Sequence, residues 1–386
     1  MIPPSPPPPA SWKFSVRDAL IAAGAVTLAG LAVWNVLQNM QGAGLAPGFA
    51  FLWQGAGFDV SETLVPYSPA DPYARAILAG TLNTLFLAAV SLVLATVVGL
   101  IVGLMSVGPS PIARAVAGAY VEMFRNLPKL LVLLVLFVAA VTGLPHVRQA
   151  LSLGPVHLSN RSLLFPVPVL EPGHALVLAA FGAGCGACWL LARHFARRRE
   201  AGQAAPPLWP FVLLALGGLP LAVALGLGLP FAWSVPQLAG FDYEGGARVS
   251  LQFMVIAVTL ALYHGAQIGE VVRGGISAIP RGQTEAAHAI GLTPRQATRY
   301  IVVPQAVRII VPSMNNQYVN LIKNTSIAIA VGYSDLMSVS GTVINQTFRP
   351  LEMMLLTMAV YLAICLCVTT RLNRINDRLR LKEGRA

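Results

Sequence analysis

Long apolar segments alternate with shorter polar ones along most of the chain. A helix needs about 20 apolar residues to cross the hydrocarbon layer of a membrane, and windows of that length recur throughout. They predict transmembrane helices at 18–38, 77–106, 119–142, 174–193, 208–229, 250–273, 303–334 and 351–371. Barrel strands would be short and alternating, so the pattern predicts an all-α integral membrane protein with about 8 transmembrane helices.

The charge distribution gives this bundle an orientation. Hydrophobic residues make up 56% of the chain and charged residues only 11%, and the net charge is +11. A basic balance can indicate nucleic-acid binding, but the basic residues gather on one side of the predicted spans, for example at Arg17, 193–199 and 372–386. Because basic loops remain in the cytoplasm, we expect both chain ends on the cytoplasmic side of the membrane, with lipid contact and no nucleic-acid partner.

One polar stretch, TEAAHAIGLTPRQATRYIVVPQ at 284–305, separates two predicted spans on the cytoplasmic side. We expect Thr284 to cap a short helix that starts at Glu285, whose carboxylate would lie at the positive end of the helix dipole. Gly291 is expected to end that helix in the left-handed conformation. Residues 293–296 form a predicted capping box with proline at the first helical position. The stretch therefore predicts a rigid helix-turn-helix that protrudes into the cytosol.

The same stretch resembles the EAA signature of ABC importer permeases, in which EAA is followed at fixed spacing by Gly, Ile, an aliphatic residue and Pro. The matching positions are Glu285, Ala286, Ala287, Gly291, Ile301 and Pro304, with Val303 at the aliphatic position. Segments 263–287 and 315–339 look like the polar amino-acid uptake branch of that superfamily, and 81–84 and 120–128 resemble its first core helices. The layout is similar to that of general L-amino-acid transport permeases.

The resemblance implies a type I ABC importer permease fold that is interrupted by an insert with two additional spans. The expected segments are a disordered Pro-rich tail (1–16), a first span with a periplasmic loop (17–76), the first part of the permease core (77–142), the insert (143–250), the second part of the core (251–371) with the coupling loop (284–304), and a basic cytoplasmic tail (372–386).

A type I importer pairs two permease chains with two cytoplasmic ATP-binding subunits, and a periplasmic binding protein delivers the substrate. The resemblance therefore implies a location in a bacterial inner membrane. It implies as well that this chain carries a broad range of L-amino acids into the cytoplasm, and that the second permease chain is a paralogue. Within the coupling loop 284–304, residues 284–290 would be the coupling helix that docks in a groove of the ATPase. No GxxxxGK[ST] surrounds any lysine, so we expect no catalytic residue or ATPase site in this chain, and ATP and Mg are used by the partner subunits.

Polar side chains inside predicted spans are costly in lipid and usually face a cavity or a partner. In the span 250–273, Tyr263, Gln267 and Glu270 share one helix face, and Arg273 lies a turn beyond Glu270. This spacing fits a transport role for Glu270 and equally fits a pair between Glu270 and Arg273.

The span 303–334 supplies the preferred substrate site. Its candidate pathway residues are Asn316, Asn320, Lys323, Asn324, Thr325 and Ser326. The first three share one helix face, and the last three are typical capping residues that predict a break in the helix. A new half-helix would then present its positive end to the carboxylate of an amino acid, with Lys323 adding charge. Interhelical polar packing without substrate contact is the competing interpretation.

Other polar groups receive mainly structural interpretations. Glu122 and Arg125 are i, i+3 neighbours near the cytoplasmic entry and Pro128 follows them, so we expect these three to brace or gate their helix. Asn83, in the second span, is a further pathway candidate. The histidines lack ligand spacing and the cysteines lie in apolar runs, so neither a metal site nor a disulfide framework is expected.

Two other classes of function compete with an ABC permease. An ion-coupled secondary transporter would also be an apolar helical bundle, but it would work without ATPase subunits. A membrane enzyme is disfavoured because no nucleophile, base and orienting group converge in the sequence. The EAA pattern favours the importer over both.

Overall fold

The computed structural model describes residues 16–42, 48–169, 173–200, 203–204, 206–228 and 232–381. Nearly all of the expected Pro-rich tail 1–16, and the end of the basic tail 372–386, lie outside the described residues. The chain divides into two compact units, one formed by 1–86 and 334–386 and the other by 87–333. Helix α2 (Tyr73–Val107) passes from the first unit into the second.

The first unit combines the beginning of the chain with its last two helices. It contains α1 (Val16–Gly42), the 3-10 helix η1 (Ala50–Trp53), the first turns of α2, α12 (Leu336–Thr347) and α13 (Pro350–Leu381). Its apolar core includes Phe51, Tyr73, Leu336, Val343 and Met353. Gly80 of α2 allows α12 to approach closely, because a Cβ at this position would lie 3.1 Å from the carbonyl oxygen of Asp335.

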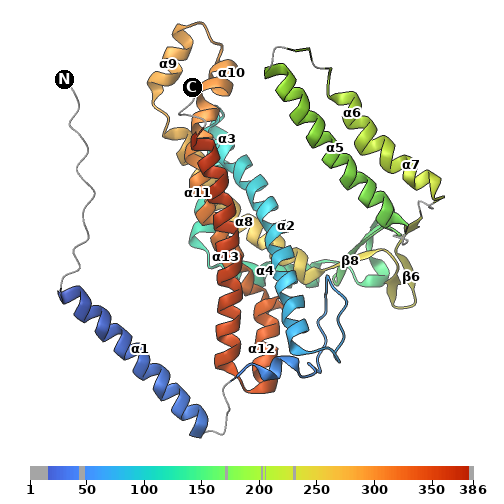
Figure 1. Ribbon diagram of the computed structural model, residues 1–386, viewed down its shortest axis with the longest axis vertical. Coiled ribbons are helices and arrows are strands. Elements are labelled where there is room, and N and C mark those ends of the chain that lie inside the picture. The colour runs from blue at the N-terminus through green and yellow to red at the C-terminus, as the bar shows by residue number, and fades with distance from the viewer. Residues whose placement is uncertain are drawn as a thin grey trace. The chain divides into compact units, whose positions relative to one another are not determined.

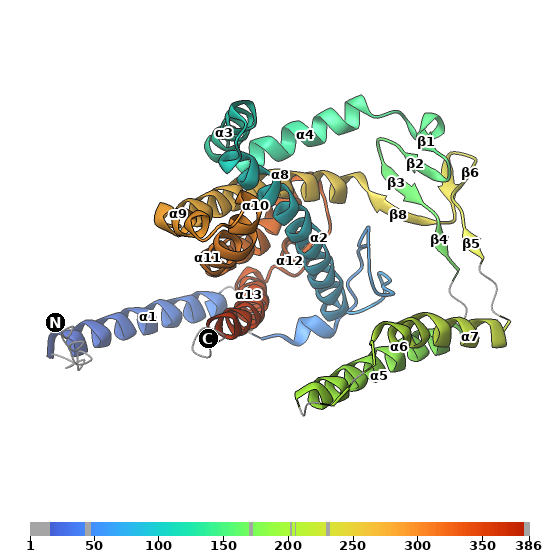
Figure 2. The same cartoon turned by 90° about the horizontal axis from the view of Figure 1, so that it is seen from above.

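Helix α8 (Leu251–Ser277) is the centre of the second unit. It packs against α3 (Pro111–Asn126), α4 (Lys129–Gly143) and α11 (Val303–Asn324), as Figures 1 and 2 show. The rest of α2 also crosses α8 at close range, because a Cβ on Gly99 would overlap the side chain of Ile268. In consequence, 67% of the apolar window of α8 is buried within the chain.

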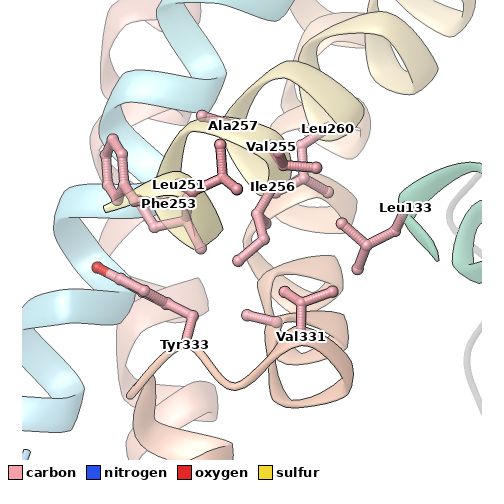
Figure 3. Packing of buried hydrophobic residues seen from close by; sticks show 11 residues of the cluster. Leu133, Leu251, Phe253, Val255, Ile256, Ala257, Leu260, Val331 and Tyr333 are labelled. Carbon is pink, nitrogen blue, oxygen red and sulfur yellow. The ribbon is translucent and has the colours of Figure 1, made fainter. Parts of the chain in front are cut away.

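An apolar cluster fixes the first turns of α8 on their neighbours (Figure 3). It brings Phe253 and Leu260 of α8 together with Leu133 of α4 and with Tyr333. The ring centroids of Phe253 and Tyr333 are 5.8 Å apart, within the range of favourable aromatic contacts. The cluster also holds the 3-10 helix η5 (Thr325–Val331), which continues α11.

The insert between α4 and α8 contains a small β-module. After the 3-10 turn η2 (Val147–Gln149), an antiparallel sheet is formed in the order β1 (Leu151–Leu153), β2 (Val156–Leu158), β3 (Ser162–Phe165) and β8 (Ala247–Ser250). Two further antiparallel pairs are β4 (Val167–Pro168) with β5 (Trp233–Ser234) and β6 (Gln237–Ala239) with β7 (Asp242–Glu244). The fold is mostly helical, as expected, and these strands were not predicted because most are too short to show an alternating pattern.

A helical hairpin forms the remainder of the insert. Its first arm is α5 (His174–Glu200), and its second arm consists of α6 (Trp209–Leu213), the π-helical turn η3 (Leu214–Gly218) and α7 (Leu219–Gly226). The two arms pack side by side (Figure 1). Only 6% of the apolar window of each arm is buried within the chain.

The predicted spans correspond to helices in the described part of the chain. Helices α2, α5, α8 and α13 and the second hairpin arm (Trp209–Gly226) are each long and apolar enough to cross a membrane. The total rises from 5 to 7 if each of two bent helix pairs forms one span. The first predicted span, 18–38, lies in α1. The total of about 8 spans stays a prediction.

One of the predicted spans is wrong as a continuous helix, and a second ends slightly earlier than predicted. The span at 119–142 is divided between α3 and α4, which meet at a bend of 105°. Pro128 causes this break, since a proline cannot donate its backbone nitrogen and disfavours helical geometry in the residue before it, here Leu127 with ψ of 138°. The span at 303–334 ends at Gly332, whose φ of +78° is in the left-handed region.

Candidate functional site

The polar loop between α8 and α11 folds as two short helices. Helix α9 (Arg281–Ala289) is followed by α10 (Pro294–Ala297) and by the π-helical turn η4 (Thr298–Val302), which leads into α11. The expected start at Glu285 under a Thr284 cap is wrong, because α9 begins at Arg281 and Thr284 lies inside it. Pro280 explains the earlier start, since a proline cannot continue α8 and the next helix begins directly after it.

The two ends of the turn between these helices form as predicted. Gly291 ends α9 with a φ of +85°, and the N–H of Leu292 donates to the carbonyl oxygen of Ala287 at 3.1 Å. In α10, the backbone N–H of Gln296 donates to the Thr293 hydroxyl at 3.4 Å. The side-chain oxygen of Gln296 accepts a bond from the Thr293 N–H at 2.9 Å, which completes the capping box.

The EAA residues of α9 divide between its buried and exposed sides. Ala287 is 3% exposed, whereas Glu285 is exposed and Ile290, directly after the helix, is 75% exposed. Gln305 of α11 donates from Nε2 to the Oε1 of Gln283 on α9 at 3.2 Å. The loop therefore presents a carboxylate and an apolar side chain on a helix that is tied to α11.

The other EAA positions lie on both sides of the turn. Ala286 is exposed on α9, Ile301 is half-buried in η4, and Pro304 is exposed in the first turn of α11. Pro304 directly follows the π-helical turn η4, in which the Val303 N–H donates to the carbonyl oxygen of Thr298, five residues back. The coupling role of all six positions stays a prediction.

A polar cluster lies where the start of α4 meets α8 and the end of α11. The Lys129 Nζ donates to the Asn324 Oδ1 at 2.6 Å and lies 5.4 Å from the centre of the Tyr263 ring. The Asn324 Nδ2 lies 3.0 Å from the Nε2 of His264, which is fully buried. Because a lysine can only donate, it fixes the amide so that Nδ2 faces His264, and His264 accepts through an unprotonated Nε2.

The predicted helix break at Asn324, Thr325 and Ser326 is wrong. α11 passes into η5 with right-handed helical geometry, and Asn324 makes no side-chain cap. The Thr325 hydroxyl donates to the carbonyl oxygen of Ile322 at 2.8 Å, and the Ser326 hydroxyl to that of Lys323 at 2.9 Å. These residues bond back to the preceding turn instead of capping a new one, so no helix N-terminus is free there to bind a carboxylate.

The predicted polar face of α11 does form. Asn316, Asn320 and Lys323 lie on one side of the helix, and each is exposed within the chain. Lys323 takes part in no side-chain hydrogen bond or ion pair among the described residues. This face therefore does not pack into the chain's own core.

Glu270 forms an ion pair with Arg273, which is one of the two interpretations that the sequence spacing allowed. The Arg273 Nε donates to Oε1 at 3.0 Å and its Nη2 to Oε2 at 2.8 Å, in the bidentate geometry that favours such pairs. Gln267, one turn earlier on α8, is half-buried. Pathway roles for Glu270 and Gln267 stay predictions.

A polar cavity of about 360 Å³ lies beside this ion pair. Its lining includes Ser106, Arg114, Glu122, Arg125, Glu270 and Arg273. In α3 the Asn126 Nδ2 donates to the carbonyl oxygen of Glu122 at 2.8 Å. The position of Glu122 and Arg125 directly before the bend at Pro128 is consistent with the bracing or gating role predicted for all three.

Asn83 is held by two backbone groups of the first unit. It is 2% exposed, and its Nδ2 donates to the carbonyl oxygens of Glu62 at 2.6 Å and Ser334 at 2.8 Å. These bonds connect the loop before α2 with the segment before α12. Its predicted place in a pathway has no support from this geometry and stays a prediction.

Sequence reasoning missed Lys129 and His264. A signal for each was present: Lys129 is the first residue after Pro128 in an otherwise apolar run, and His264 interrupts the apolar face of its span. No group of three potential metal ligands occurs in the part of the chain that the structure describes. All four cysteines, Cys185, Cys188, Cys365 and Cys367, are free thiols.

Residues 95–382 match the family described as "Binding-protein-dependent transport system inner membrane component". The match covers more than half of the chain, so the chain belongs to this family of transport permeases. The predicted type I ABC importer permease is thereby confirmed, and the protein is an integral membrane subunit of such an importer.

Three relatives are similar over nearly the whole chain. General L-amino acid transport system permease protein AapQ of Rhizobium johnstonii is 38% identical over 363 residues, 93% of this chain and 90% of its own length. Putative amino-acid ABC transporter permease protein YhdX of Escherichia coli is 36% identical and covers 97% of this chain and 95% of its own. Glutamate/glutamine/aspartate/asparagine transport system permease protein BztB of Rhodobacter capsulatus is 36% identical, with coverages of 92% and 91%. These alignments are too long to leave out the insert 143–250.

Proposed function

We propose that this permease subunit carries amino acids into the cytoplasm along the polar face of α11. The observation that carries the proposal is the exposure of Asn316, Asn320 and Lys323 on a helix of the membrane bundle. Polar side chains are costly against lipid, so this face meets an aqueous passage or a second permease chain. The names of the three relatives support amino acids as the substrate class.

The partners follow from the same family membership. We propose a paralogous permease across the α11 face, two ATP-binding subunits that use ATP and Mg, and a periplasmic binding protein that delivers the substrate. Helix α9 would dock on an ATP-binding subunit through Glu285 and Ile290, with both chain ends in the cytoplasm. Movement of α9 would reach α11 through the bond between Gln283 and Gln305 and through η4.

Uptake by the complete complex tests this function. The chain, a second permease, the ATP-binding subunit and the binding protein from neighbouring reading frames are reconstituted in proteoliposomes, and ATP-dependent uptake of labelled amino acids is measured. Lys323→Met should lower uptake by more than about 10-fold, because a charged group in the passage is lost. Co-purification of the ATP-binding subunit should be unchanged.

The competing ion-coupled transporter makes the opposite prediction. Ion-gradient-driven uptake by the isolated chain, with no requirement for ATP, would refute the importer mechanism. Unchanged uptake by Lys323→Met would remove the α11 face from the pathway. A control at Leu178→Met, on the exposed surface of α5, should leave uptake unchanged.

A further inference from the structure

We infer that the β-module of the insert is a docking surface for the periplasmic binding protein, and that its pocket with Arg148 and Arg161 receives an acidic side chain of that protein. The inference rests on the proposed function, which includes a binding protein as a partner. It deepens that proposal, because it assigns the contact to one pocket of this chain and names the chemistry that the partner must present.

The β-module lies at the end of α8 that is opposite to the coupling loop (Figures 1 and 2). Strand β8 leads directly into α8 at Leu251, whereas α9 follows the other end of α8, after Ser277. A helix of 27 residues is about 40 Å long, enough to cross a hydrocarbon layer of roughly 30 Å. Because the coupling loop is proposed to meet the ATP-binding subunit in the cytoplasm, the β-module lies on the periplasmic side, where the binding protein arrives.

The β-module contains an open pocket of about 190 Å³. Its lining consists of Arg148 in η2, Arg161 between β2 and β3, Phe241 between β6 and β7, and His146 and Val147. All of these except Val147 are exposed. Pockets for small-molecule ligands usually have volumes of about 300–1,000 Å³. The smaller volume fits one side chain of a partner protein better than a free substrate.

The two guanidinium groups in this lining have no acidic partner in the described part of the chain. The ion pairs there include neither Arg148 nor Arg161. The neighbouring Asp242 is already paired with Arg248, whose Nη2 lies 2.8 Å from its Oδ1. Burial raises the pKa of the Asp242 carboxyl, but the Tyr243 N–H, Arg248 and the more distant charge of Arg161 lower it below its usual value. The lining therefore keeps two positive charges that a carboxylate of a partner can neutralise.

One arginine is stacked on an aromatic ring, and the other extends from a fixed backbone. The Arg148 guanidinium lies 4.1 Å from the centre of the Phe241 ring, which is 78% exposed. The carbonyl oxygen of Arg161 accepts a bond from the N–H of Leu251, the first residue of α8, at 2.9 Å. Arginine binds carboxylates through paired hydrogen bonds, and arginine and aromatic residues are enriched in protein interfaces. An acidic side chain bound here would thus lie next to the start of α8.

A purely structural role for the two arginines makes a different prediction. Loss of a structural arginine would lower the stability of the β-module and would weaken binding equally at low and high salt. Loss of a docking arginine should slow association and reduce the salt dependence of binding, because opposite charges steer the encounter and salt screens them. Thermal stability should then stay unchanged, since both side chains are exposed.

The test measures binding of the binding protein to the assembled permease and ATP-binding subunits in nanodiscs of phosphatidylcholine, a lipid without net charge. Biolayer interferometry at two salt concentrations gives the association rate and the Kd. Arg148→Gln and Arg161→Gln should each raise the Kd by about 10-fold, the lower end for a charged hydrogen bond because the pocket is open to water. Arg161→Lys keeps the charge and should lose less. Arg197→Gln, on the exposed surface of α5, is the matched control and should bind like the wild type.

Four outcomes would overturn the docking pocket and leave the proposed function intact. The first is a wild-type Kd for both glutamine variants in a complex whose uptake requires the binding protein. The second is a rise in Kd that is equal at both salt concentrations and accompanies lower thermal stability, which indicates a structural role. The third is an effect seen only with phosphatidylglycerol in the nanodisc, which assigns the pocket to anionic lipid. The fourth is binding of free glutamate that Arg148→Gln abolishes, which assigns the pocket to the substrate.

Failure of the proposed function has a separate signature. If the complete transporter took up no amino acid although the binding protein bound to it, the proposed transport would be refuted. The effects of Arg148→Gln and Arg161→Gln on the Kd would then still decide whether the pocket is a docking site.

Discussion

Helices α8 and α5 have the same length, yet they occupy different environments. Each has 27 residues and is apolar enough to cross a membrane. Within the chain, 67% of the apolar window of α8 is buried, compared with 6% for α5. α8 carries polar side chains along the middle of its length, such as His264, Gln267 and Glu270, whereas the charged residues of α5 follow its apolar part.

This difference in burial distinguishes the helical bundle around α8 from the helical hairpin that contains α5. Polar side chains within a membrane bundle need hydrogen-bond or ionic partners. Helix α8 packs against α3, α4 and α11, and these contacts bring polar groups of other helices within its reach. A helix such as α5, with an apolar surface and few contacts, requires only lipid or another apolar chain. Length and hydropathy therefore indicate that a helix crosses a membrane, and polar positions and close backbone contacts indicate whether it takes part in transport.

The largest difference in stability should come from the apolar cores. Leu260→Ala in α8 removes a fully buried side chain and should destabilise the folded bundle by about 2 kcal/mol or more. Leu178→Ala in α5, a position 66% exposed, should change stability by less than about 0.5 kcal/mol. Thermal unfolding of the purified complex in detergent measures both. Equal losses would show that α5 is as tightly packed as α8.

Substituted glycines sharpen the same comparison. Gly99→Val should destabilise the crossing of α2 and α8 by about 1–3 kcal/mol, because the new side chain would overlap Ile268. Gly182→Val in α5 meets open space within the chain and is the matched control. The yield of assembled complex on size-exclusion chromatography reports the effect, and an unaffected Gly99→Val complex would contradict the close crossing.

The next largest effect should come from substitutions in the coupling loop. They should lower uptake more than they disturb assembly of the complex. Gly291→Val places a β-branched residue at a φ of +85°, which costs about 1–3 kcal/mol of backbone strain and should disorganise the end of α9. Uptake should fall while ATP hydrolysis continues. Gly282→Ala, in the same helix with open space around it, should keep both activities. Similar uptake by the two variants would exclude a requirement for this turn.

The smallest effect should come from the second helix of the loop. Thr293→Ala removes one half of the capping box and should destabilise α10 by about 1 kcal/mol. Faster amide hydrogen exchange over 294–297, with stability of α8 unchanged, is the expected result. Thr293→Ser retains the hydroxyl and should restore protection, so equal exchange in both variants would argue against the cap.

The sequence predicted the parts of this molecule that follow from local chemistry. Apolar windows located the long helices, and the left-handed Gly291 and the capping box at 293–296 follow from turn chemistry that needs no distant contact. The EAA pattern identified the family for the same reason, because its residues lie within one loop.

The remainder depends on contacts between distant segments. The cluster of Lys129, His264 and Asn324 joins three helices and is not visible as a spacing in the sequence. In the β-module, β3 pairs with β8 although the whole helical hairpin lies between these two strands in the sequence. The helix break was placed at 324–326 because capping residues occur there, but in the structure two of their hydroxyls bond back to the preceding turn and the break falls at Gly332.

The exposure of the α11 face to water during transport is the central claim, and thiol labelling tests it most directly. In a complex whose native cysteines are replaced, Asn320→Cys on α11 and Leu178→Cys on α5 are treated with a membrane-impermeant thiol reagent with and without ATP. Asn320→Cys should react, at a rate that changes with ATP, and Leu178→Cys should stay unreactive in lipid. Labelling of Asn320→Cys that is as slow as that of Leu178→Cys in every nucleotide state of a transport-competent complex would contradict the account.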